Sequence, residues 1–203
     1  MHIIDELQNT LGETSLDGGT AMINSHLLVC SFDKVKEWYV SEKVPYSNPN
    51  PKSNDALYFG EHESFFIEFK NGRITDAVNY EINKKIYDSL FILFDLEYTD
   101  KNGRNVSSIS YTRTNMTYIL VYNEELYAQN NPTKQTEIGI KRQTEKSKSR
   151  HRDALYKTVR GLANKEFILF GLDQFKNYLF KNVYTYTEKE FEQKFIKCQE
   201  KII

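Results

Sequence analysis

The sequence predicts an α/β protein in which a central mixed β-sheet is flanked by helices. Residues 56–59 and 64–70 are two strand-like runs separated by Gly60-Glu61-His62-Glu63, the pattern of a β-hairpin. Residues 81–96 carry apolar side chains at helical spacing, and residues 116–122 form a run rich in β-branched and aromatic residues. Strands that alternate with a helix in this way are typical of α/β folds.

Length and composition exclude several classes of protein. A chain of 203 residues with 39% hydrophobic residues can bury a core, so we expect a single folded domain over residues 1–203. The 27 basic and 28 acidic side chains give a net charge of −1, which excludes a wholly basic polyanion binder. Cys30 and Cys198 offer neither a disulfide framework nor a zinc spacing, and neither a secretory signal nor a membrane-spanning run is evident. These features predict a cytoplasmic protein with no membrane partner.

The first forty residues predict two helices around a short strand. Helical spacing of Ile3, Ile4, Leu7 and Leu11 before Gly12 indicates an N-terminal amphipathic helix. Residues 16–20 contain Gly18-Gly19 and read as a turn, and residues 26–31 read as a short strand or buried run. A helix capped by Ser31 or Asp33 follows, with four apolar side chains on one face: Phe32, Val35, Trp38 and Tyr39.

The remaining elements follow a proline-rich loop over residues 44–54. After the hairpin, the helix over 81–96 and the strand over 116–122, residues 165–203 predict a further strand and a helical tail. The strand is Phe167-Ile168-Leu169-Phe170, and the tail carries Phe191, Phe195 and Ile196.

Residues 134–160 form a basic stretch with nine basic and three acidic side chains, a local excess of +6. Outside it the balance is 18 basic against 25 acidic, so the near-neutral total is a cancellation. Such a stretch is either a solvated surface segment or a contact for nucleic-acid phosphates, with Lys141 and Arg142 as candidate contacts.

Three charged residues around the hairpin suggest chemistry. Asp55 stands just before the first strand, and Glu68 and Lys70 share one face of the second because side chains alternate along a strand. Asp55 can lie beside Glu68 across the hairpin. Paired carboxylates are hard oxygen ligands suited to Mg²⁺ or Mn²⁺, and a neighbouring lysine can orient or help deprotonate a water for phosphodiester hydrolysis. The alternative is a surface ion pair, although apolar flanks around Glu68 indicate a central strand, where unneeded charges are costly.

Asp55, Glu68 and Lys70 resemble the acid and E-x-K motif of the PD-(D/E)XK nuclease superfamily, whose core is a restriction-endonuclease-like mixed sheet flanked by helices. The resemblance covers residues 30–125, with Asn54 where the motif has proline. It implies Asp55, Glu68 and Lys70 as catalytic residues, with Asp55 and Glu68 as metal ligands.

Three further residues are candidates for this site. The resemblance suggests Glu42, on the same helix face as Trp38 and Tyr39, as a third metal ligand. Lys85 and Ser89 lie one turn apart beside the apolar stripe of the following helix and are candidates to contact the scissile phosphate.

The sequence therefore predicts a Mg²⁺-dependent or Mn²⁺-dependent nuclease. DNA is the expected substrate. By analogy with nucleases of this superfamily, we expect a role in a mobile-element or phage-defence context. Three modes of action stay open from the sequence: alone, as a homodimer, or with a recruiting protein partner. Two alternatives remain open: a non-catalytic nucleic-acid-binding protein of the same fold, and a protein-interaction module that uses the 14 tyrosines as contact anchors.

Overall fold

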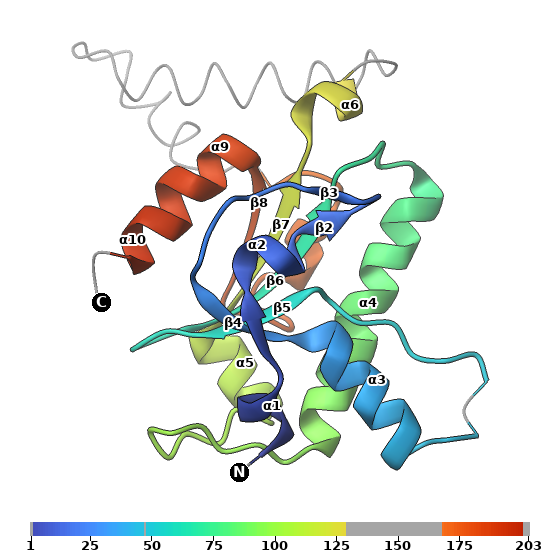
Figure 1. Cartoon of the computed structure of the whole chain (residues 1–203), viewed down its shortest axis with the longest axis vertical. Coiled ribbons are helices and arrows are strands. Elements are labelled where there is room, and N and C mark those ends of the chain that lie inside the picture. Colours follow the sequence, from blue (N-terminus) through green and yellow to red (C-terminus); the bar gives the residue numbers. More distant parts are fainter. Residues whose placement is uncertain (1, 47, 129–167, 201–203) are drawn as a thin grey trace.

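A computed structural model describes residues 2–46, 48–128 and 168–200 and shows an α/β fold built on a mixed six-stranded sheet (Figure 1). The strand order is β1-β4-β5-β6-β7-β8. The strands are β1 (Gln8–Thr10), β4 (Leu28–Ser31), β5 (Ala56–Phe59), β6 (Ser64–Lys70), β7 (Met116–Tyr122) and β8 (Asn182–Thr187). The predicted hairpin and the strand over 116–122 are confirmed with the expected bounds.

The sheet changes from antiparallel to parallel at β6. Strands β1, β4, β5 and β6 pair antiparallel, whereas β6, β7 and β8 pair parallel. Strand β6 is hydrogen-bonded on both edges, which confirms the expectation that it is central. Helix α4 (Asp76–Asp95) and the shorter α5 (Ile109–Asn115) connect β6 to β7. This connection is the crossover that a parallel pair requires.

Helices cover both faces of the sheet and form two apolar cores. On one face, α3 (Phe32–Glu42), α4 and the 3₁₀ turn η1 (Leu172–Phe175) pack against the side chains of Phe66 and Leu120. The opposite face, with Ile67 and Ile119, is covered by α2 (Leu11–Thr14) and by consecutive C-terminal helical segments (Figure 1). These segments are α9 (Glu188–Phe191), the π-helical η2 (Glu192–Ile196) and α10 (Lys197–Gln199).

Helix α4 is longer than predicted. It begins at Asp76 because the Thr75 hydroxyl accepts a hydrogen bond from the Val78 backbone N–H, and it ends before Leu96. Its buried stripe includes Ile82, Ile86 and Leu93. No helix in the described ranges has the length and apolarity needed to cross a membrane.

Two predicted elements are wrong. The N-terminal helix over 3–11 is instead α1 (Ile3–Glu6), strand β1 and α2, because residues 8–10 pair with β4 and a capping box between Thr10 and Glu13 starts a new helix. Residues 168–170 are not a strand. Leu169 and Phe170 are buried in the core next to η1, and the edge strand is β8, thirteen residues further along the chain from Leu169.

The remaining elements are short. Strands β2 (Leu16–Asp17) and β3 (Thr20–Ala21) form a hairpin whose turn is Gly18-Gly19, as expected from the sequence. Both glycines have positive φ, 61° and 81°, which other residues adopt with strain. Helix α6 (Glu124–Ala128) follows β7. The basic stretch over 134–160 lies outside the described residues.

Candidate functional site

The two carboxylates of the predicted motif lie side by side on adjacent strands. Ala56 of β5 pairs with Ile67 of β6, so the next position of this register places Asp55 opposite Glu68. The Phe69 backbone N–H donates a hydrogen bond to Asp55 Oδ2 at 2.6 Å. The Asp55 carboxylate therefore takes the place of a backbone carbonyl as the acceptor for the Phe69 N–H, just before β5 begins. This bond fixes the orientation of Asp55 towards Glu68.

Two lysines approach the carboxylates from different elements. Lys85 comes from α4, and its Nζ lies 2.7 Å from Glu68 Oε1 and 3.1 Å from Asp55 Oδ1. Lys70 comes from β6, and its Nζ lies 3.4 Å from Glu68 Oε1. Asp55, Glu68, Lys70 and Lys85 form what we call the acid–lysine cluster. The structure thus brings the predicted motif residues together and adds Lys85 at their centre.

Burial increases along the cluster towards Glu68. The side chain of Glu68 is fully buried, whereas 13% of the Asp55 side chain and about a fifth of each lysine side chain are exposed. Approach from solvent is therefore by way of the lysines and Asp55. Asp17 of β2 lies beside Lys70, with Oδ2 3.9 Å from its Nζ, and accepts a hydrogen bond from the Asn71 backbone N–H.

Polar residues behind the cluster hold its backbone in place. Ser89 Oγ, one turn along α4 from Lys85, accepts a hydrogen bond from the Asn54 backbone N–H at 2.8 Å. Ser53 Oγ donates to Asp33 Oδ1 in the first turn of α3. Helices α3 and α4 are thereby tied to the segment that carries Asp55. Ser89, predicted as a phosphate contact, is buried and serves this backbone instead.

Burial and neighbouring charges shift the pKa values of both acids. Burial raises the pKa of Asp55 well above its usual value, and the neighbouring charge of Glu68 raises it further. The pKa of Glu68 is raised by burial, against the opposing effect of Lys85 and Lys70. For Lys85, burial lowers the pKa, but the two carboxylates outweigh burial and raise it, so its ammonium stays charged. Two acids that resist holding two negative charges are a natural place for a cation.

The residues present fit a Mg²⁺ or Mn²⁺ ion. Glu68 Oε2 is buried, and no hydrogen-bond partner for it occurs among the described residues. A buried carboxylate oxygen without a hydrogen-bond partner costs free energy unless a ligand binds it. The same residues contain no group of three or more His, Cys, Asp or Glu side chains arranged for a metal. Mg²⁺ does not require one, since it is held by one or two carboxylates together with waters and substrate phosphates.

Glu42 is not part of the cluster. It lies in the last turn of α3 with an exposed side chain, and Ser41 is its hydrogen-bond partner. Asp33, at the start of the same helix, is the α3 acid near the cluster, and its charge raises the pKa of both Asp55 and Glu68. Sequence reasoning treated Asp33 as a helix cap. Lys141 and Arg142 lie outside the described residues.

Tyr118 of β7 is a second residue that the sequence did not single out. It lies on the Glu68 face of the sheet, is fully buried, and its hydroxyl has no partner among the described residues. Burial and the charges of Glu68 and Asp55 raise its pKa, so the phenol stays protonated. The sequence gives no signal for Tyr118, because it is one of several apolar and aromatic residues in a strand in which every residue is buried.

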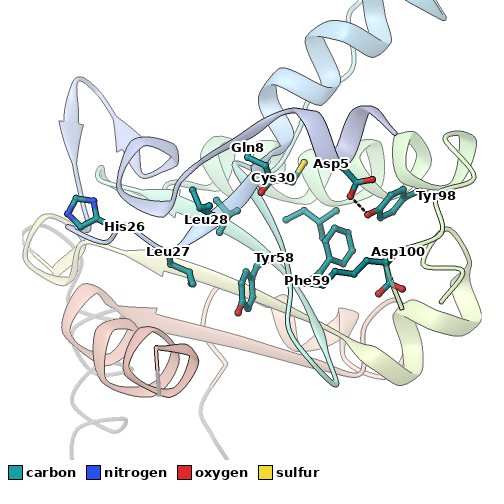
Figure 2. Close-up of a pocket in the computed structure, with 13 residues that line it drawn as sticks. Asp5, Gln8, His26, Leu27, Leu28, Cys30, Tyr58, Phe59, Tyr98 and Asp100 are labelled. Carbon is teal, nitrogen blue, oxygen red and sulfur yellow. Dashed lines mark hydrogen bonds between the residues drawn. The ribbon is translucent and has the colours of Figure 1, made fainter. Parts of the chain in front are cut away.

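A cavity of about 550 Å³ lies at the other end of β5, where β4 and β5 separate beyond the Cys30–Leu57 pair (Figure 2). Leu28 and Phe59 line its walls, and the Tyr98 hydroxyl donates a hydrogen bond to Asp5 at its rim. No member of the acid–lysine cluster lines it. The cavity is a separate feature from the candidate site.

Comparison with protein-family models, curated proteins and solved structures finds no match to this chain. The geometry of the acid–lysine cluster is therefore what indicates a function.

Proposed function

We propose that this chain is a metal-dependent nuclease with a restriction-endonuclease-like core, and that it hydrolyses phosphodiester bonds in DNA. The observation that carries the proposal is the convergence of Asp55, Glu68 and Lys70 on one face of adjacent strands. A charge cluster on a solvent-facing strand, the ordinary explanation, would not bury Glu68 completely at the centre of a sheet.

Each residue of the cluster has a distinct part in this chemistry. Asp55 and Glu68 would hold Mg²⁺ or Mn²⁺, and the bound ion supplies positive charge against the charge that develops on the phosphate oxygens. Lys70, 3.4 Å from Glu68, is placed to orient the attacking water and help remove its proton. The Phe69 N–H donates to Asp55 Oδ2 and so holds this carboxylate in position for the ion.

The surrounding sheet supports the same interpretation. Antiparallel strands β4, β5 and β6 continue through α4 into the parallel strand β7, which is the mixed arrangement that the resemblance implies. The acids lie on β6 and beside it, where the sheet changes direction. Helix α4 follows directly and supplies Lys85.

One observation favours a second candidate, a nucleic-acid-binding protein that does not cleave. The Lys85 ammonium already bridges Asp55 and Glu68, so the acid pair is compensated by the chain itself. In this candidate the cluster is a buried ion pair of the fold and holds no metal. It predicts salt-dependent binding of nucleic acid without hydrolysis.

Incubation with supercoiled plasmid, single-stranded DNA and RNA in Mg²⁺, Mn²⁺ or EDTA distinguishes the two candidates. The nuclease predicts cleavage that requires metal and falls by about 100-fold or more in Lys70→Ala, the usual range for a lost general acid or base. Lys101→Ala, an exposed lysine outside the cluster, is the control and should cleave like the wild type. Binding without cleavage in every metal would support the second candidate and contradict the first.

A further inference from the structure

The side chain of Lys85 occupies the position that a divalent cation would take between the two carboxylates. Its Nζ is within 3.1 Å of one oxygen from each acid, so the ammonium is the cation of the pair in this state. Asp55 Oδ2 accepts from the Phe69 N–H, so a metal ion bound by both acids would need Asp55 Oδ1, the oxygen that faces the ammonium, at about 2.0–2.1 Å. An ammonium is a compact point charge, and Asp55 Oδ1 cannot hold the ammonium and a metal ion at once.

The charges around the pair favour exchange of one cation for the other. Acids outnumber lysines around the pair, so the formal charges of the group sum to −2. The acids are Asp17, Asp33, Asp55 and Glu68, and the lysines are Lys70 and Lys85. If a divalent ion takes the place of the Lys85 ammonium between the acids, the sum becomes −1. The exchange therefore reduces the uncompensated charge.

The fold allows only the end of Lys85 to move. Ile82 and Ile86 on the same helix are fully buried, and Ser89 ties α4 to Asn54, so the backbone at Lys85 is fixed. The ammonium stands on a flexible four-carbon stem, and 18% of the side chain is exposed. The displaced ammonium can then turn outwards to where a phosphate would approach.

We propose that Lys85 is an internal competitor of the metal: its ammonium closes the acid pair in the metal-free protein and must be displaced before a divalent ion binds. This inference rests on the proposed metal site and describes how metal binding at that site is regulated. Lys85 is thus a positioning residue in the metal-free state and becomes available to a substrate phosphate only after metal entry. The apparent metal affinity equals the intrinsic affinity multiplied by the fraction of molecules in which Lys85 does not hold the acids.

Calorimetric titration of the full chain with Mn²⁺ tests this, without nucleic acid. Lys85→Met keeps the length and apolar stem but removes the charge, and we expect it to bind Mn²⁺ about tenfold or more tightly than the wild type. Lys84→Met is the matched control, because Lys84 is the preceding residue and pairs with Asp88 instead. It should bind Mn²⁺ like the wild type.

The outcomes separate this inference from the proposed function. Mn²⁺ binding that is equal or weaker in Lys85→Met overturns the inference and leaves the metal site standing. Absence of Mn²⁺ binding in both proteins overturns the metal site and the inference together. Tighter binding in Lys85→Met with no cleavage by the wild type supports the competition and contradicts the nuclease.

A second measurement needs no variant, because Lys85→Met leaves Glu68 with less compensation and could impair folding. Wild-type protein is acylated with acetic anhydride with and without Mn²⁺, and the modification of each lysine is followed by mass spectrometry. We expect the acylation rate of Lys85 to rise severalfold with Mn²⁺ while that of Lys84 stays constant. An unchanged or lower rate at Lys85 overturns the proposal.

Discussion

At the scale of single residues, the cluster is positioned by bonds to the backbone. Asp55 accepts from the Phe69 N–H, and the residue before it, Asn54, donates its own backbone N–H to Ser89. Asn54 is fully buried. A small shift of this segment would move the Asp55 carboxylate away from Glu68, so the proposed hydrolysis should be sensitive to residues that never touch substrate.

Substitution Ser89→Ala tests that sensitivity. The buried Asn54 N–H loses its acceptor, so we expect the free energy of unfolding to fall by about 1–3 kcal/mol. The rate of metal-dependent nicking should fall as well, since Asp55 is less well held. Urea unfolding and a plasmid assay measure the two effects. Ser41→Ala, on the exposed side of α3, is the control, and a Ser89→Ala protein as stable as that control would contradict the account.

The sequence was sufficient to predict which motif residues converge, because strand alternation and hairpin register decide it. It was not sufficient to predict which acid of α3 lies near the cluster: the sequence pointed to Glu42 at the end of the helix, whereas Asp33 at its start is the one. That choice depends on which end of the helix faces the cluster, a matter of packing between elements. The side-chain bond from Ser53 to Asp33 joins residues twenty positions apart and has no local signature.

At the scale of elements, β8 and the N-terminal segment show how local signals compete. Asn-Val-Tyr-Thr-Tyr-Thr in β8 has the composition of a strand, but the apolar run at 167–170 is the stronger local signal. Leu169 and Phe170 instead fill the core beside η1. In the N-terminal segment, pairing with β4 outweighs helical periodicity, and only the capping box at Thr10 indicates the break.

The loop between α4 and α5 is stabilised by a buried carboxylate. Asp100 accepts from the backbone N–H groups of Asn102 and Arg104 and from the Arg104 guanidinium. Burial alone would raise its pKa, but these bonds outweigh burial and lower it. Because the folded pKa lies below the unfolded value, Asp100 stabilises the protein above the unfolded pKa, and this contribution is lost as pH falls through the folded pKa.

Asp100→Asn should therefore have an effect that depends on pH. At pH 7 we expect a loss of about 1.5–3 kcal/mol in the free energy of unfolding, the range for hydrogen bonds to a charged group. The difference from wild type should shrink as the pH falls below about 4, near the unfolded pKa of an aspartate. Urea unfolding at several pH values measures it, with the exposed Asp173→Asn as control. A difference that does not change with pH would contradict this assignment.

At the scale of the whole molecule, one sheet joins N-terminal strands to β8 near the C-terminus. Trp38 of α3 packs on the same core as Phe180, which precedes β8. This connectivity predicts a single cooperative unfolding transition, with Trp38 fluorescence and far-UV circular dichroism changing together. Two separated transitions would contradict the prediction of one domain over the chain.

The central position of β7 predicts where the molecule is most sensitive to truncation. Leu120 is fully buried beside Glu68 on the neighbouring strand, so Leu120→Ala should cost about 2–5 kcal/mol. Leu126→Ala, on a half-exposed side chain of α6, should change stability by no more than about 0.5 kcal/mol. Equal urea midpoints for the two variants would be inconsistent with the sheet order described here.

The central claim is that Asp55 and Glu68 form a metal site that hydrolyses phosphodiester bonds, and the Mg²⁺-dependent rate of plasmid nicking by Glu68→Gln tests it most directly. Glutamine keeps the shape and removes the charge that a metal requires. The account predicts that wild type nicks plasmid in Mg²⁺ and not in EDTA, and that Glu68→Gln is slower by about 1,000-fold, as expected for several kcal/mol of lost charge stabilisation. Equal rates in the two folded proteins, or nicking that persists in EDTA, would contradict it.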